Sequence, residues 1–287
     1  MINNNFSIST VAYAGYPIDQ ALDAIHSLGV YNVELALIQG AIYNLDENGM
    51  SHQLVSDVHK KLLERNMRCT SFAAHCELSI ENCNELLLKR VKMTHLLDCP
   101  RLIVYAPRDG NLVTFQRAAK EAIKLAEQLD IKILLENVGD MQPYLLNDHN
   151  DFATVLQGYT SHSMGINFDP GNLASHRPDS NLLLESIESL KVAEHIHIKD
   201  LVLVGDSYHF CAIGNGLCQY QELFQHAANC EEMPFFSIEA PFSLIRSTDG
   251  RAMLKPIEQL LPIEEINHKL KQSVALIQRS FSQVPQP

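Results

Sequence analysis

The sequence of 287 residues lacks several features that would each point to a different class of protein. It has no uninterrupted apolar run of about 18 residues, so we expect no transmembrane helix. Its first fifteen residues, MINNNFSISTVAYAG, lack the basic start and long apolar run of a signal peptide, and we expect a cytoplasmic protein. It also lacks a linker and a low-complexity tract. We therefore expect one domain over residues 1–287, with a frayed tail at 283–287.

Positive charge is scarce in this chain. It has 22 lysine and arginine residues against 34 aspartate and glutamate residues, which gives a formal net charge of −12. Because nucleic acids and anionic membranes are bound by cationic surfaces, neither is expected as a partner. A hydrophobic content of 46% and a charged content of 20% are typical of a globular protein with a large core.

Paired cysteine motifs are absent as well. The seven cysteines are an odd number and include no CxxC pair. This pattern indicates reduced, mostly buried thiols of an intracellular protein, and it argues against a disulfide framework or a zinc knuckle.

What the chain does contain is a regular alternation of short β-rich runs with amphipathic helical runs, which predicts parallel strands joined by helices. Eight rounds can be counted. The strands are expected at 6–12, 32–37, 68–75, 101–107, 132–138, 164–170, 192–200 and 235–241. The helices are expected near 18–28, 51–63, 79–97, 112–129, 148–156, 179–190, 219–228 and 263–281. Eight strand-helix units in 287 residues predict an α/β fold, a single (β/α)8 TIM barrel.

Four of these strands end with a side chain that can bind a metal ion. ILLENV carries Glu136, MGINFDPGN carries Asp169, EHIHIKD carries His197 and FFSIEAP carries Glu239. Because the carboxyl ends of all barrel strands meet at one face, these four side chains are expected to converge. Three carboxylates and one imidazole suit one divalent ion, either Mn, Mg, Co or Zn. His195 lies on the same face of its strand as His197.

At this point the chain resembles a known family, the xylose isomerase-like barrels. These include sugar isomerases and epimerases, ketohexose 3-epimerases, inosose dehydratase, 3-dehydroshikimate dehydratase and endonuclease IV. The segments that carry the resemblance are NVEL at 32–35, LLEN at 134–137, FDPGN at 168–172, HIKD at 197–200, IGNG at 213–216 and SIEA at 237–240. Their order and spacing span most of the chain.

The resemblance implies a metal held by the same four residues, which binds two adjacent oxygens of a small polyol or hydroxyketone. The ion would acidify the neighbouring C–H bond and stabilise the enediolate that forms. In the epimerases of this family, two glutamates also move protons on opposite faces of that intermediate. Glu136 and Glu239 would take these catalytic roles here. The resemblance selects His197 as the histidine ligand, so His195 is expected to pack behind the site.

The chain departs from the epimerase pattern at two positions and from the nuclease pattern at others. Asn172 stands where the epimerases have a histidine, and Leu203 stands where they have an arginine, six residues after the histidine ligand. Endonuclease IV has further histidine ligands, but here strand four offers Tyr105, and an Asp-x-His pair is missing because Asp206 and His209 are three residues apart. Both the ketohexose-epimerase and the nuclease interpretations are weakened.

Five further residues are expected to bind substrate: His75, Asn172, Lys199, Glu34 and Arg246. Glu34 ends strand two in a position that often faces the pocket, but a structural salt bridge is an equal alternative. Arg246, like Arg108, follows a strand end and is suited to a phosphate or carboxylate group.

We therefore expect a divalent-metal-dependent isomerase or epimerase of a small sugar, sugar derivative or hydroxyketone. The main alternative is a metal-dependent dehydratase of inosose or dehydroshikimate type, in which an enolate expels water. A sugar-binding barrel without turnover and a nuclease acting on abasic DNA are more distant alternatives. The sequence leaves open the substrate, the metal and the oligomeric state, including a homo-oligomer.

Overall fold

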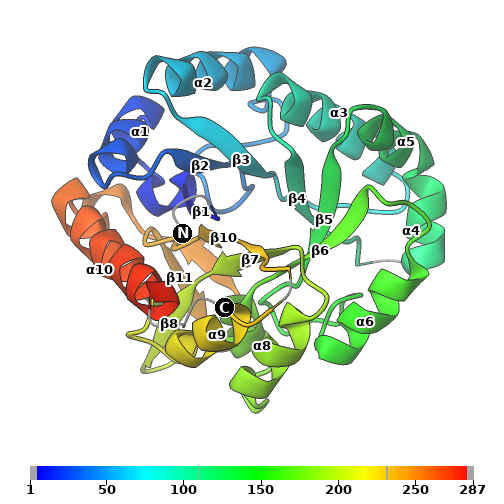
Figure 1. The fold of residues 1–287 in the computed structure, drawn as a ribbon. Helices are drawn as coiled ribbons and strands as arrows, with labels where there is room; N and C mark the ends of the chain where they lie inside the picture. Colours follow the sequence, from blue (N-terminus) through cyan, green and yellow to red (C-terminus); the bar gives the residue numbers. More distant parts are fainter. Residues whose placement is uncertain (1–4, 109, 231, 283–287) are drawn as a thin grey trace.

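Eight parallel strands close into a barrel, and most of the helices form a ring outside it (Figure 1). The structure is a computed structural model, and it describes residues 5–108, 110–230 and 232–282. Around the barrel the strands follow chain order from β1 to β7, and β10 closes the ring by pairing with both β7 and β1. The predicted (β/α)8 barrel is therefore confirmed. The predicted frayed tail at 283–287 lies outside the described residues.

The elements agree with the eight predicted strand-helix units. The barrel strands are β1 Phe6–Ser9, β2 Asn32–Ala36, β3 Arg68–Ala73, β4 Arg101–Tyr105, β5 Lys132–Glu136, β6 Met164–Phe168, β7 His195–Ile198 and β10 Phe235–Ile238. The helices are α1 Ile18–Ser27, α2 His52–Glu64, α3 Cys83–Leu96, α4 Leu112–Ala118, α5 Lys120–Gln128, α6 His149–Gly158, α7 Pro170–His176, α8 Leu182–Leu190, α9 Tyr220–Ala227 and α10 Ile263–Ser282, with short 3-10 turns η2 Thr10–Tyr13 and η3 Ile257–Gln259.

The barrel strands are buried on both faces, which explains their nearly continuous apolar runs. In β5, Ile133, Leu134 and Leu135 are all fully buried, although successive side chains point alternately into the barrel and toward the helices. Along a strand of this kind, almost no side chain is exposed to solvent before the last residue. Polar side chains at the strand ends therefore gather at one mouth of the barrel.

Some predicted boundaries were wrong for local reasons. The first strand ends at Ser9, where the chain enters the turn η2. The third helix begins at Cys83 and not near Ser79, because Ser79 and Asn82 exchange side-chain bonds to each other's backbone N–H groups at 2.7 and 3.2 Å. The single helix predicted over 112–129 is two helices, α4 and α5, which meet at Ala119.

The structure also contains a second, antiparallel sheet, which the sequence did not predict. It contains β8 Asp200–Val204, β9 Ser207–Cys211, β11 Leu244–Ser247 and β12 Ala252–Leu254, in the order β12-β11-β9-β8. The sequence predicted neither a strand nor a helix over residues 201–216. A two-residue Gly205–Asp206 turn joins β8 to β9, and Gly205 has a φ of +63°, as hairpin turns of this length require.

Helix α7 follows β6 directly and was also missed. Asp169 is its N-cap, because the Asp169 Oδ1 atom accepts a hydrogen bond from the Asn172 N–H at 2.9 Å. Pro170 occupies the first helical position, where a proline loses no helical hydrogen bond. The Asp-Pro pair therefore begins a helix.

Within the described residues, the helices are too short or too polar to cross a lipid bilayer.

Candidate metal centre

Four side chains from consecutive strands meet at one point at the mouth of the barrel. Glu136 ends β5, Asp169 follows β6, His197 lies in β7 and Glu239 follows β10. All four are buried, and each has one ligand atom within 4.8 Å of those of the other three. Two ligands on opposite sides of one ion, each at about 2.1 Å, lie about 4.2 Å apart, so this cluster has the dimensions of a single divalent-ion site.

Two atoms of this cluster have no hydrogen-bond partner in the described residues, although both are buried. They are Asp169 Oδ2 and His197 Nδ1. Asp169 uses Oδ1 to cap helix α7, which leaves Oδ2 facing the other three side chains. Both atoms have charged neighbours, since Asp169 Oδ2 lies 2.6 Å from Lys199 Nζ and His197 Nδ1 lies 2.9 Å from Glu136 Oε2. Carboxylate oxygens and an imidazole nitrogen gathered at one buried point fit a site built for a cation.

His197 is oriented from behind by Glu34. Glu34 Oε2 lies 2.9 Å from His197 Nε2 and accepts a second hydrogen bond, from Ser71 Oγ, at 2.7 Å. A donated Nε2–H leaves the Nδ1 lone pair for the cluster, the usual arrangement of a metal-binding histidine. Burial lowers the pKa of His197, but Glu136, Glu239 and Glu34 together raise it well above its usual value. Burial raises the Glu34 pKa, yet His197 brings it down to about 2.

His195 lies deeper in the barrel, as expected. Its Nδ1 atom is 2.7 Å from Asn167 Oδ1, and its ring stacks on Phe235. Burial holds the pKa of His195 well below its ordinary value, so this histidine is a neutral packing residue.

Glu136 is held on both of its carboxylate oxygens. Asn172 Nδ2 donates to Oε1 and Asn167 Nδ2 donates to Oε2, each at 2.8 Å. Near Oε2 lie His75 Nε2 at 3.2 Å and His197 Nδ1 at 2.9 Å. Burial raises the pKa of Glu136, but His197 and His75 bring it well below the usual value. Asn167 was not singled out from the sequence, although its place two residues before Asp169 puts it on the same face of β6.

Lys199 places its ammonium group between two of the four cluster side chains. Its Nζ atom is 2.6 Å from Asp169 Oδ2 and 2.5 Å from Glu239 Oε2. The Tyr220 hydroxyl accepts from the Lys199 N–H and donates to the Lys199 carbonyl, both at 2.8 Å, which fixes the backbone here. Burial lowers the pKa of Lys199, but the adjacent carboxylates raise it above its ordinary value. Burial raises the pKa of Asp169 to about 6.

The Asp200 side chain holds the backbone of the segments around it. Its carboxylate accepts backbone hydrogen bonds from Leu201, Gly214, Gly216 and Cys218 at 2.9 to 3.1 Å. A Cβ atom on Gly216 would lie 2.2 Å from Asp200 Oδ1, so glycine is required at this position. The IGNG segment is therefore a loop folded around one buried carboxylate.

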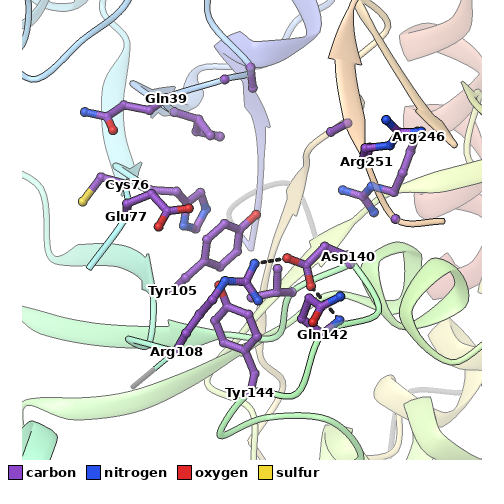
Figure 2. Close-up of a pocket in the computed structure, with 18 of the residues that line it drawn as sticks. Gln39, Cys76, Glu77, Tyr105, Arg108, Asp140, Gln142, Tyr144, Arg246 and Arg251 are labelled. Carbon is purple, nitrogen blue, oxygen red and sulfur yellow. Dashed lines mark hydrogen bonds and ion pairs between the residues drawn. The ribbon is translucent and has the colours of Figure 1, made fainter. Parts of the chain in front are cut away.

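A cavity of about 700 Å³ opens above the cluster. Its lining includes His75, Tyr105 and Arg246, and the rings of His75 and Tyr105 stack with centroids 4.0 Å apart. The four cluster side chains are not part of this lining, and His75, 3.2 Å from Glu136, connects the cavity to them. Figure 2 shows Arg246 and Arg251 on one side of the cavity, Cys76 and Glu77 on the other, and Tyr105 between them. The volume is typical of a site for a small molecule.

The sequence profile of the xylose isomerase-like TIM barrels matches residues 22–257. The chain belongs to this family. A comparison with curated protein sequences gave no match.

Several solved structures share the fold of this family member. A D-psicose 3-epimerase from Clostridium cellulolyticum H10, solved with D-tagatose, has a TM-score of 0.70 and 12% identity, over 96% of this chain and 99% of that one. An L-ribulose 3-epimerase has a TM-score of 0.68 and 12% identity, over 96% and 94% of the two chains. A 3-keto-D-glucoside 4-epimerase from E. coli has a TM-score of 0.63 and 11% identity, over 94% and 99%. At such low identity, these likenesses establish the fold only.

The residues expected to bind substrate fall into two groups. His75 and Arg246 line the cavity. Asn172, Lys199 and Glu34 lie outside that lining and instead contact the cluster side chains or their neighbours. Their contacts favour a role in holding the cluster over direct contact with a substrate.

The additional ligands of the nuclease pattern are not assembled here. Asp206 lies in the exposed turn between β8 and β9, and His209 lies in β9. Neither belongs to any of the candidate metal-binding groups that the described residues form. Tyr105, on β4, stacks on His75 where that pattern has a further histidine.

Proposed function

We propose that this protein is a divalent-metal-dependent isomerase or epimerase, acting on a small sugar or related hydroxyketone through an enediolate. The observation that carries the proposal is the buried group of three carboxylates and one imidazole beneath a cavity of about 700 Å³. We further propose that the whole chain, 1–287, acts as one domain.

In this proposal Glu136, Asp169, His197 and Glu239 hold one ion, either Mn, Mg, Co or Zn. When bound, the ion would polarise a substrate carbonyl and stabilise the negative charge that develops on the two neighbouring oxygens. Asn172 and Asn167 keep Glu136 in place, while Glu34 keeps His197 in place. Preorganisation of this kind saves the cost of reordering these groups during the reaction.

Glu136 and Glu239 are the proposed proton-transfer groups. Their strands, β5 and β10, are three positions apart around a ring of eight, so the two carboxylates approach the mouth from nearly opposite sides. One can remove a proton from one face of the substrate while the other returns a proton to the opposite face, which inverts the carbon. The stacked His75 and Tyr105 rings would form the wall against which the substrate lies.

The test is isotope exchange in heavy water. Protein loaded with Mn²⁺ is incubated with a panel of ketoses and hydroxyketo acids, and NMR follows deuterium at the carbon next to the carbonyl. We expect deuterium in an isomer or in returned substrate, and we expect loss of exchange after chelation or in Glu239→Gln. Glu194→Gln, which alters an ion pair with Lys132 where β5 begins, is the matched control and should retain exchange.

Other outcomes separate the alternatives. A new conjugated absorbance without deuterium in an isomer would indicate a dehydratase. Tight metal and sugar binding without exchange in any member of the panel would contradict the proposal and favour a binding protein without turnover.

A further inference from the structure

Arg246 is a buried cation on the wall of the cavity. It lies in β11, and only 8% of the residue is exposed. One terminal nitrogen donates hydrogen bonds to Asn172 Oδ1 at 3.1 Å and to Ser175 Oγ at 2.7 Å. Both acceptors are neutral, so these bonds fix the position of the guanidinium group without balancing its charge.

The other two arginines of the cavity have carboxylate partners. Arg108 pairs with Asp140, and the exposed Arg251 pairs with Asp249 at 2.8 Å. In the described ranges, 5–108, 110–230 and 232–282, no carboxylate lies within ion-pair distance of Arg246, and its other two nitrogens have no hydrogen-bond partner. A buried charge is costly unless it is paired, so this guanidinium is suited to receive an anion from outside the chain.

The position of Arg246 relates it directly to the proposed chemistry. Asn172 accepts from Arg246 through Oδ1 and donates to Glu136 through Nδ2, so two hydrogen bonds connect the arginine to a cluster carboxylate. An anionic group on Arg246 would therefore lie within one small-molecule length of the cluster. The planar guanidinium can bind two oxygens of a carboxylate or phosphate at once.

We propose that Arg246 binds a carboxylate or phosphate group of the substrate, so that the substrate class is an anionic hydroxyketone, either a sugar acid or a sugar phosphate. This assignment rests on the proposed function for the meaning of "substrate", but the anion site can be tested without turnover.

The test compares binding of three probes by calorimetry: D-fructose, which is neutral, 2-keto-D-gluconate and D-fructose 6-phosphate. Each is measured with and without Mn²⁺. We expect at least one anionic probe to bind about tenfold more tightly than D-fructose, or better, because a charge-assisted bidentate pair forms. Which anion is preferred distinguishes a sugar acid from a sugar phosphate.

Two variants remove the site in different ways. Arg246→Gln removes the charge, and we expect the anion preference to fall below about twofold. Gly139→Ala keeps the charge but displaces it, because a Cβ atom there would lie 2.1 Å from an Arg246 terminal nitrogen. We expect this variant to weaken anion binding as well, which covers the case in which Arg246→Gln fails to fold.

Arg251→Gln is the matched control, since it removes an arginine of the same cavity that already has a carboxylate partner. It should keep the full anion preference. The inference is wrong if D-fructose binds as tightly as both anions, if no anion binds, or if Arg246→Gln keeps the preference. An anion preference that Arg246→Gln abolishes, in a protein without isotope exchange, would support the site and refute the proposed reaction. If neutral ketoses undergo isotope exchange and Arg246→Gln leaves this exchange unchanged, the proposed reaction is supported and the anion site is refuted.

Discussion

Glu34 provides the sharpest test of the metal centre, because it contacts a proposed ligand without being one itself. It is fully buried, lies 2.9 Å from His197 Nε2 and is held by Ser71 at 2.7 Å. The carboxylate fixes the ring and its tautomer and makes Nδ1 a better electron donor. Loss of such a partner typically lowers metal affinity about 10- to 100-fold.

The two replacements should rank in a defined order. Glu34→Gln can still accept the His197 Nε2–H bond through its amide oxygen, so it loses the negative charge but keeps the tautomer. We expect a loss of about tenfold, or about 1.4 kcal/mol. Glu34→Ala loses both the charge and the acceptor, and we expect the loss to approach about 100-fold, or about 2.7 kcal/mol.

The assay is competition for Mn²⁺ against a fluorescent chelator, with circular dichroism to verify the fold. Glu47→Gln is the control, because Glu47 is also an ion-paired glutamate, bound to Lys89 and Arg90 on α3. It should lower stability and leave Mn²⁺ affinity unchanged within about twofold. If Glu34→Ala bound Mn²⁺ as tightly as the unaltered protein, His197 would not be a ligand through Nδ1, and the proposed set of four metal ligands would be wrong.

Three further predictions concern stability. Burial lowers the pKa of His176 to about 4, and its Nδ1 atom accepts the Met141 N–H at 3.0 Å, so the folded state resists protonation of this ring. The free energy of unfolding should therefore be highest above about pH 6.5 and fall by up to about 3 kcal/mol toward pH 4. Urea titrations of His176→Gln should show a smaller fall. Lys199→Met removes the ammonium group from between two cluster carboxylates, where its charge would compete with a bound ion. Calorimetric scans should therefore show a lower Tm without metal and a larger increase in Tm on adding Mn²⁺ than in the unaltered protein, and an equal increase would contradict this competition. Asp200→Asn leaves some of the backbone N–H groups around this side chain without a hydrogen-bond acceptor, so chemical denaturation should show a free energy of unfolding about 3 kcal/mol lower. The control Asp206→Asn alters an exposed side chain and should lower the free energy of unfolding by less than about 0.5 kcal/mol.

The barrel and its four strand-end side chains could be predicted because they depend on local signals. A buried parallel strand is a short apolar run, and a carboxylate that ends such a run, like Glu136 or Glu239, stands out from it. Alternation placed His195 and His197 on one face but could not rank them. The structure separates them by depth, since His195 contacts Asn167 while His197 reaches the cluster.

The partners of these side chains could not be predicted, because they come from distant parts of the chain. Glu34 and His197 are 163 residues apart, and Arg246 and Asn172 are 74 residues apart. Glu34 was equally compatible with a pocket and with a salt bridge, and only the closed ring brings it behind His197. The second sheet, by contrast, left a visible signal in the sequence, because a Gly-Asp pair such as Gly205–Asp206 between two β-rich runs is typical of a hairpin turn.

The second sheet also changes how the leucine at position 203 is interpreted. Its position, six residues after His197, carries an arginine in the related epimerases, and leucine there indicated that a substrate contact was missing. In the sheet, Leu203 pairs with Tyr208, and Tyr208 pairs with Arg246, so the three residues form one row across β8, β9 and β11. Side chains in such a row lie on one face, and the ends of the row are about 10 Å apart. A cation absent from β8 is thus present two strands away, on the wall of the cavity. A comparison along the sequence records a loss at Leu203, whereas the sheet register places Arg246, a residue of the cavity lining, in the same row on β11.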